Sequence, residues 1–261
     1  MNSQEDVKKQ YEVTDNLDIR IALHEKYSSN KQGFGSWIFS HYQFKTASAN
    51  TVRVLDVGCG TADLWAENYA NLPVNVDLIL TDYSKGMVAA STLKMEQYQN
   101  VQCERADIMD LPFDANSFDV VTANMMLYHV PDLEGALKEV HRVLKSDGVF
   151  YTSTFGTPSL AQTLGSWLSH FTGVVDSPET FTLQNGAASL KTCFTDVVRL
   201  DYPDSLEVTD ARDLLAYVYS LPEVFHLKDT QRQDVLSVLA SHKVDGVISI
   251  PKEYGLFVCR P

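Results

Sequence analysis

A carboxylate and two glycines stand close together in the stretch VLDVGCGTAD, residues 54–63, as Asp56, Gly58 and Gly60. Glycine has no Cβ, so a turn that contains it can bend tightly and let a ligand lie against the backbone. The amides at the start of a following helix point into the same space. Because the residues before Gly58 are mostly apolar, the stretch predicts a polar ligand at the end of a buried strand.

The spacing in this turn separates three classes of nucleotide-binding site. A dinucleotide-binding turn has a third glycine where this chain has Asp63, and a P-loop has a Lys followed by Ser or Thr, which residues 58–67 lack. An anionic pyrophosphate would also be repelled by Asp56 and Asp63. A ligand that carries positive charge therefore suits the turn better.

Two further carboxylates follow apolar runs. Asp82 ends LILTD, residues 78–82, and Asp107 lies in VQCERADIMDLPF, residues 101–113. A carboxylate at the C-terminal end of a strand can accept hydrogen bonds from both hydroxyls of a ribose, a device that NAD-dependent enzymes also use. Asp107 alternatively reads as a helix cap or turn residue, because Asp is common in both.

Taken together, in this order along the chain, these three stretches resemble motifs of the class I S-adenosylmethionine-dependent methyltransferases. The resemblance is in particular to the small-molecule branch similar to the quinone-biosynthesis (UbiE-like) enzymes. The resemblance covers about 50–154 and, weakly, the last strand. It implies S-adenosylmethionine as methyl donor and S-adenosylhomocysteine as product. The cofactor-binding residues that it implies are Asp56, Gly58, Gly60, Asp82, Tyr83, Met87, Asp107, Ile108, Asn124, Arg20 and Tyr27.

The resemblance also implies individual roles. Asp82 would bind the ribose and Asp107 the adenine amino group, with Ile108 beside the ring. Met87 would reach the other face of the adenine, although a methionine at such a helical position is more commonly a core residue.

A helical extension covers the cofactor in similar methyltransferases, which would place Tyr11, Arg20 and Tyr27 at the amino-acid end of the cofactor. The guanidinium of Arg20 suits a carboxylate. Ordinary surface and packing roles are the alternative for all three residues.

His129 lies in MMLYHVPD, residues 125–132, directly after a predicted strand. The stretch is similar to the segment after the fourth strand in the same methyltransferases, where it would face the transferred methyl group. An imidazole there could act as general base for an oxygen or nitrogen nucleophile. We favour the alternative, a histidine at a helix start that hydrogen-bonds to the backbone. The histidines and cysteines lack metal-ligand spacing, so no metal is expected.

The strands and helices that the apolar patterns predict must hold these residues in place. Strands are predicted at 52–57, 78–82, 100–104, 118–124 and 149–154. Helices are predicted at 62–71, at 85–98 behind an N-cap at Ser84, and at 131–148, which would begin at Pro131 and end at Gly148. Strands that alternate with helices in this way predict a parallel sheet with right-handed crossovers.

The whole chain is predicted to be an α/β protein with a Rossmann-like, seven-stranded, mostly parallel sheet. The sixth strand would contain TDVVRLDY, with Thr209 capping a helix at 210–220, and YGLFVCR resembles the antiparallel last strand that the family inserts between the fifth and sixth. Four segments are expected: an N-terminal helical extension (1–50), the cofactor-binding core (51–154), a helical cap insertion (155–192) that builds the acceptor pocket, and the C-terminal part of the core (193–261).

Composition narrows the function further. The formal charge is −13 with a pI near 4.8, which argues against nucleic acid as a partner because phosphate binding depends on Lys and Arg. Four scattered cysteines read as core thiols and favour a reducing cytoplasm. No leader or membrane-spanning stretch is recognised, and a monomer or homodimer is expected.

The prediction is therefore a cytoplasmic enzyme that transfers a methyl group to a small-molecule acceptor. Two alternatives stay open at this point. A non-catalytic module could bind the same cofactor or its product, and an NAD-dependent oxidoreductase could use the same sheet and Asp82.

Overall fold

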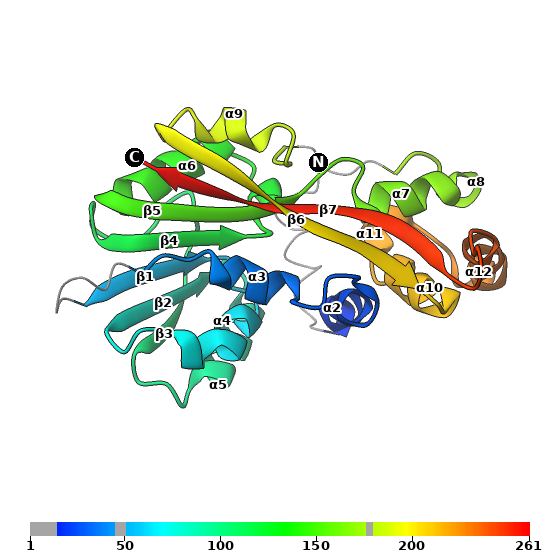
Figure 1. Cartoon of the computed structure of the whole chain (residues 1–261), viewed down its shortest axis with the longest axis horizontal. Coiled ribbons are helices and arrows are strands. Elements are labelled where there is room, and N and C mark those ends of the chain that lie inside the picture. Colours follow the sequence, from blue (N-terminus) through cyan, green and yellow to red (C-terminus); the bar gives the residue numbers. More distant parts are fainter. Residues whose placement is uncertain (1–14, 45–50, 176–179) are drawn as a thin grey trace.

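The computed structural model describes residues 15–44, 51–175 and 180–261. Seven strands form one sheet in the order β3-β2-β1-β4-β5-β7-β6 (Figure 1). β7 is antiparallel to both of its neighbours, and the other pairs are parallel, as predicted. The strands are β1 (Val52–Val57), β2 (Val76–Asp82), β3 (Val101–Arg105), β4 (Phe118–Asn124), β5 (Leu144–Phe155), β6 (Asp196–Val208) and β7 (Ile248–Arg260).

Helices cover both faces of the sheet and also lie beyond one of its ends (Figure 1). The α-helices are α2 (Asp15–Tyr27), α3 (Phe34–Ser40), α4 (Asp63–Asn68), α5 (Lys85–Met95), α6 (Leu133–Val143), α7 (Leu160–Trp167), α8 (Ser169–Thr172), α9 (Gly186–Leu190), α10 (Ala211–Tyr219), α11 (Pro222–Phe225) and α12 (Arg232–Ser241). Short 3₁₀ turns are η1 (Tyr69–Asn71), η2 (Leu127–His129) and η3 (Asp229–Gln231).

Successive side chains of β1 point to opposite faces of the sheet and pack into two separate hydrophobic clusters. Val54 belongs to the cluster under α3 and α4, whereas Leu55 belongs to the cluster under α6 and α9. Both side chains are fully buried, because a central parallel strand is covered on both faces. This double coverage explains why the strand reads as an almost continuous apolar run.

Some predicted helix ends are wrong. α6 ends at Val143 and not at Gly148, because Leu144 already pairs with Phe118 at the start of β4. Its N-cap is Asp132, which accepts a hydrogen bond from the Gly135 amide. The helix begins at Leu133, so the prediction of Pro131 as the start is two residues early.

Two further predicted caps had different outcomes. The N-cap of α10 is Asp210 rather than Thr209, because the Asp210 carboxylate accepts a hydrogen bond from the Arg212 amide. The Ser84 cap of α5 is confirmed, since its hydroxyl accepts from the Met87 amide.

A second hydrophobic core lies beyond the end of the sheet, at the right of Figure 1. It forms because β6 and β7 pair along 13 residues each, much further than the sequence predicted. Leu206 on β6 and Ile250 on β7 are buried there against side chains from α2, α7, α10 and α12.

The residues predicted as a helical cap, 155–192, divide between the two cores. Leu164 of α7 is buried in the second core, whereas Leu190 of α9 is buried on the sheet face beside α6. Among the described residues of this segment, Phe155, Ser159, Leu160 and Ala161 border the cavity at the strand ends. Within the described ranges, no helix is long and apolar enough to cross a membrane.

Candidate functional site

A cavity of about 850 Å³ opens where β1, β2 and β4 end. Its walls come from the turns after these strands, from α2 and the segment after it, and from α10 and α11 of the second core. In a parallel sheet the strand ends collect loops at one edge, which is where ligands bind in such folds. The volume lies in the upper part of the usual range for small-molecule sites.

The glycine turn after β1 forms one wall of the cavity. Gly58 and Gly60 have φ angles of +76° and +57°, a region that side chains with a Cβ rarely adopt. The Gly58 and Cys59 amides both donate to the Thr81 carbonyl, at 2.8 and 2.9 Å, so β2 holds the turn in place. A Cβ on Gly58 would lie 2.9 Å from Cγ of Met126, which follows β4.

Asp82 lies beside this turn and lines the cavity as predicted. Its Oδ2 accepts a hydrogen bond from the Gly60 amide at 3.0 Å, and its Oδ1 accepts one from the Ser84 amide at 2.8 Å. Burial raises the pKa of Asp82, while these amide hydrogen bonds lower it. A carboxylate has about four lone-pair positions, so Asp82 can still accept from a ligand hydroxyl.

Asp56 does not line the cavity, which corrects the expectation that three carboxylates meet there. It is 4% exposed, and its two oxygens accept hydrogen bonds from Trp65 Nε1 at 2.7 Å and Thr122 Oγ1 at 2.5 Å. Burial raises the pKa of Asp56 to about 6, against the effect of both hydrogen bonds. The side chain therefore joins β1 to α4 and β4 and is not part of the cavity wall.

Three residues predicted around the adenine line the cavity, Met87, Asp107 and Ile108, and so does Tyr83, which was predicted to bind the cofactor without a stated role. Met87 and Ile108 are buried, and Tyr83 is 40% exposed with the Arg105 guanidinium 4.9 Å from its ring centroid. Asp107 also acts as a turn residue, because its Oδ1 accepts from the Met109 amide at 3.0 Å. Asp107 thus fits both the predicted place beside the adenine and the alternative of a turn residue.

Asn124 ends β4 and faces the cavity. Its Nδ2 donates to the Tyr42 hydroxyl at 2.7 Å, whereas its Oδ1 is buried and has no hydrogen-bond partner among the described residues. The next residue, Met125, has a φ of +52°, so the chain turns sharply away from the strand. A buried carbonyl oxygen without a donor suits a ligand N–H group.

The residues predicted at the cofactor from the N-terminal helix have different positions in the structure. Arg20 lines the cavity, and its Nε donates to the Asn16 carbonyl at 2.9 Å. Tyr27 does not line it, because its hydroxyl turns to α10 and donates to Asp213 at 2.6 Å. Tyr11 lies outside the described residues.

His129 lines the cavity in the short turn η2. Burial, and then the charge of Arg20, lower its pKa to about 4. The imidazole is therefore neutral at pH 7 but a weak base, which agrees poorly with a role as general base.

Acidic side chains gather near the glycine turn. Asp63, Glu67 and Glu25 all line the cavity, and burial followed by the charges of Asp63 and Glu25 raises the pKa of Glu67. Negative charge in a cleft attracts a cationic ligand. The prediction from Asp63 of a positively charged ligand gains support from Glu25 and Glu67, which the sequence reasoning missed.

Sequence reasoning also missed the far end of the cavity. The residues there come from α2, the segment before α3, the ends of β4 and β5, and the middle of β7, so no local motif unites them. They include His24, Phe34, Phe155, Lys252 and Tyr254, next to Tyr128 of the predicted stretch 125–132.

Comparison with known proteins finds a family that is similar to the strand–helix core. Residues 55–152 match the family described as a methyltransferase domain. A demethylmenaquinone methyltransferase of Staphylococcus epidermidis is 39% identical over 108 residues, which cover 41% of this chain and 45% of the relative. The mitochondrial arginine-hydroxylase NDUFAF5 of Danio rerio is 33% identical over 176 residues, 61% of this chain and 51% of the relative. The chain thus spans about half the length of each.

Among solved structures, the cyclase SpnF has a similar fold, with a TM-score of 0.60 and 17% identity. The match covers 98% of this chain and 96% of that one. It supports the fold over nearly the whole chain, including the second core. Fold similarity at this identity does not determine the reaction.

Proposed function

Residues 55–152 match a methyltransferase-domain family, and from this premise we propose that the chain is a class I S-adenosylmethionine-dependent methyltransferase that methylates a small-molecule acceptor. The observation that carries the proposal is that the matched domain and the second core share one cavity. The Gly58 turn, Asp82 and Asp107 lie on the domain side, and α10 and α11 lie on the other. Such a cavity has room for a cofactor and an acceptor together.

For the cofactor we propose the following contacts. Asp82 accepts from the ribose hydroxyls, Asp107 accepts from the adenine amino group, and Ile108 and Met87 pack beside the adenine. Asn124 Oδ1 is buried and lacks a donor among the described residues, so it fits the α-ammonium group. Arg20 fits the carboxylate.

Bound S-adenosylmethionine supplies an activated methyl group, which a nucleophile takes by in-line displacement while sulfur leaves as a neutral thioether. The chain contributes alignment and exclusion of water, and alignment alone can supply several kcal/mol of the barrier. Gly58 and Met126 bring the turns after β1 and β4 into contact, and this contact closes one side of the site. Asp63, Glu25 and Glu67 favour a cationic cofactor over its neutral product.

The identity of the acceptor does not follow from similarity to these relatives. The match to the Staphylococcus epidermidis demethylmenaquinone methyltransferase covers 45% of that protein. The acceptor end of this cavity instead uses α2, α7, α10, α11 and β7. We therefore propose a small organic acceptor from the shape of the site and leave its identity to experiment.

Calorimetry tests the cofactor and labelling tests the reaction. We expect S-adenosylhomocysteine to bind the purified chain and NADH not to bind; NADH binding alone would overturn the proposal. Labelled S-adenosylmethionine is then incubated with small-molecule extracts, and we expect label to appear in an extracted compound. Binding without any labelled compound from a broad set of extracts would favour a non-catalytic cofactor-binding module.

A further inference from the structure

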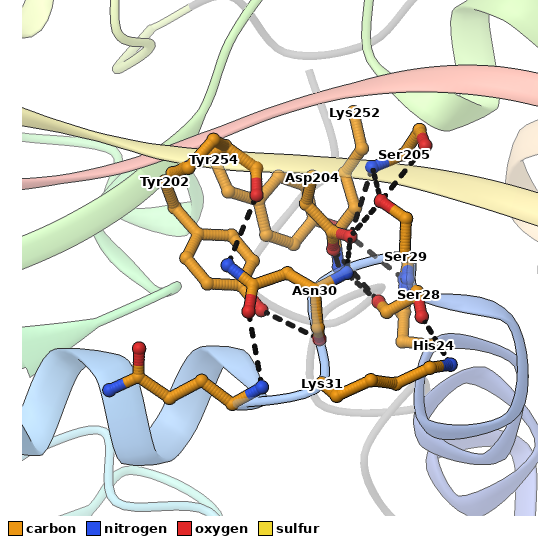
Figure 2. A network of polar contacts seen from close by, with 12 residues as sticks. His24, Ser28, Ser29, Asn30, Lys31, Tyr202, Asp204, Ser205, Lys252 and Tyr254 are labelled. Atoms are coloured by element: carbon orange, nitrogen blue, oxygen red, sulfur yellow. Dashed lines mark hydrogen bonds and ion pairs between the residues drawn. The ribbon is translucent and has the colours of Figure 1, made fainter.

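A buried ion pair organises the acceptor end of the cavity (Figure 2). Lys252 Nζ on β7 lies 2.7 Å from Asp204 Oδ2 on β6, and the two side chains are 4% and 0% exposed. Asp204 also accepts hydrogen bonds from the Ser28 hydroxyl at 2.8 Å and the Asn30 amide at 3.0 Å. The pair therefore attaches the chain after α2 to the two long strands.

This attachment places His24 against β7. The Ser28 amide donates to the His24 carbonyl, so Ser28, which directly follows α2, lies one helical turn beyond His24. Tyr254 and Lys252 are two positions apart on β7 and project to the same face of the strand. The Tyr254 hydroxyl lies 3.3 Å from Nε2 of His24, and all four side chains line the cavity.

The hydrogen bond between these two rings determines which nitrogen of His24 carries the proton. Burial raises the pKa of Tyr254, so the phenol keeps its hydrogen. Within the described part of the chain its hydrogen-bond partner is His24 Nε2, and a buried O–H that does not donate is costly. Burial, followed by the charge of Lys252, lowers the pKa of His24 to about 3, so the ring is neutral. Its proton therefore belongs on Nδ1.

Nδ1 of His24 is buried, and the described residues provide no hydrogen-bond partner for it. Aromatic rings lie next to Tyr254, the hydrogen-bond partner of His24. Phe34 lies 5.1 Å from Tyr254 between ring centroids, Tyr128 lies 4.7 Å from Phe155, and Phe155 is the β-sheet neighbour of Tyr254. These rings line the same cavity as His24, whose Nδ1–H has no acceptor among the described residues.

We propose that His24 Nδ1–H binds an oxygen atom of the methyl acceptor and thereby selects a planar, largely apolar compound with a hydroxyl or carbonyl group. A cationic amine is disfavoured, because its N–H groups would face another donor beside the Lys252 ammonium. This inference rests on the proposed methyltransferase function but concerns a different part of the cavity. His24 acts here in acceptor binding and takes no part in proton transfer.

Two probes of the same shape test the contact: 2-naphthol and naphthalene, titrated calorimetrically with and without S-adenosylhomocysteine. We expect wild-type protein to bind 2-naphthol about five- to tenfold more tightly than naphthalene, as one hydrogen bond predicts. His24→Phe should bring this ratio close to one while naphthalene affinity stays within about twofold. His24→Asn, whose amide can replace Nδ1–H, should retain most of the ratio.

His129→Phe is the matched control, since it removes a second cavity histidine. Loss of the ratio in that variant, or its retention in His24→Phe, would overturn the proposal. If His24→Phe does not fold, NMR of ¹⁵N-histidine-labelled wild-type protein decides: we expect a protonated Nδ1 on His24, and a protonated Nε2 overturns the donor role. Failure of S-adenosylhomocysteine to bind would contradict the proposed function, but the probe ratio is still measurable.

Discussion

The Asp82 carboxylate accepts a hydrogen bond from the Gly60 amide, with 3.0 Å between Oδ2 and the nitrogen. The bond joins the end of β2 to the turn after β1, the two features on which the cofactor assignment depends. Both groups line the cavity, so the turn is held in its shape before a ligand arrives. Such preorganisation reduces the entropy that binding must overcome.

Asp82→Ala should weaken S-adenosylhomocysteine binding by about 10- to 100-fold, because it removes a ligand acceptor and loosens the Gly60 turn. Calorimetry measures the affinity, and thermal unfolding checks that the variant folds. Ser84→Ala is the control: it removes the N-cap of α5 but leaves the carboxylate, so its affinity should change little. Wild-type affinity in Asp82→Ala would exclude Asp82 from the site.

Gly58→Ala should lower both stability and cofactor affinity more than Gly60→Ala does. Both positions have positive φ, which costs a residue with a Cβ about 1–2 kcal/mol. At Gly58 the new Cβ would also meet Met126, whereas at Gly60 no atom lies within 4 Å. Urea unfolding and calorimetry compare the variants, and equal effects would show that the contact with Met126 does not matter.

Trp65→Phe should destabilise the protein by about 1–3 kcal/mol, because it leaves a buried oxygen of Asp56 without its donor. The affinity for S-adenosylhomocysteine should remain within about threefold, since Asp56 does not line the cavity. Chemical denaturation measures the stability of the variant, and calorimetry measures its affinity for S-adenosylhomocysteine. A large loss of affinity at unchanged stability would return Asp56 to a direct role in binding.

Lys252→Met should destabilise the protein by about 3–5 kcal/mol, because it leaves the buried Asp204 carboxylate without its cation. Lys26→Met removes the exposed ion pair with Asp213 and should cost less than about 1 kcal/mol. Urea unfolding measures the free energy of unfolding of both variants. Similar costs for the two variants would mean that the buried pair does not stabilise the fold.

The stability of the wild-type protein should fall as the pH is lowered from 6 to 4, in part because of His24. Its pKa is about 3 in the folded protein against 6.5 in the unfolded chain, so the unfolded state binds more protons in this range. His24→Asn should therefore remove about 1.4 kcal/mol per pH unit from the slope. Denaturant unfolding at several pH values gives both slopes, and parallel curves would contradict a buried, neutral His24.

Local patterns in the sequence determined the central part of this protein. The apolar runs before Gly58, Asp82 and Asn124 predicted strands, and the carboxyl ends of parallel strands necessarily meet at one edge of a sheet. The glycines predicted the turn because positive φ values leave few other choices. Residues that line the cavity at this edge, such as Asp82 and Asn124, could thus be predicted from their positions at strand ends.

Tertiary structure decided the direction of individual side chains and the whole acceptor end. Asp56 turns to Trp65 and Thr122 because alternation along β1 places it on the face that α4 covers. The lengths of β6 and β7 depend on their mutual pairing across the intervening residues 209–247. His24 meets Tyr254 only through that pairing, because packing between distant segments leaves no periodic signal in the chain.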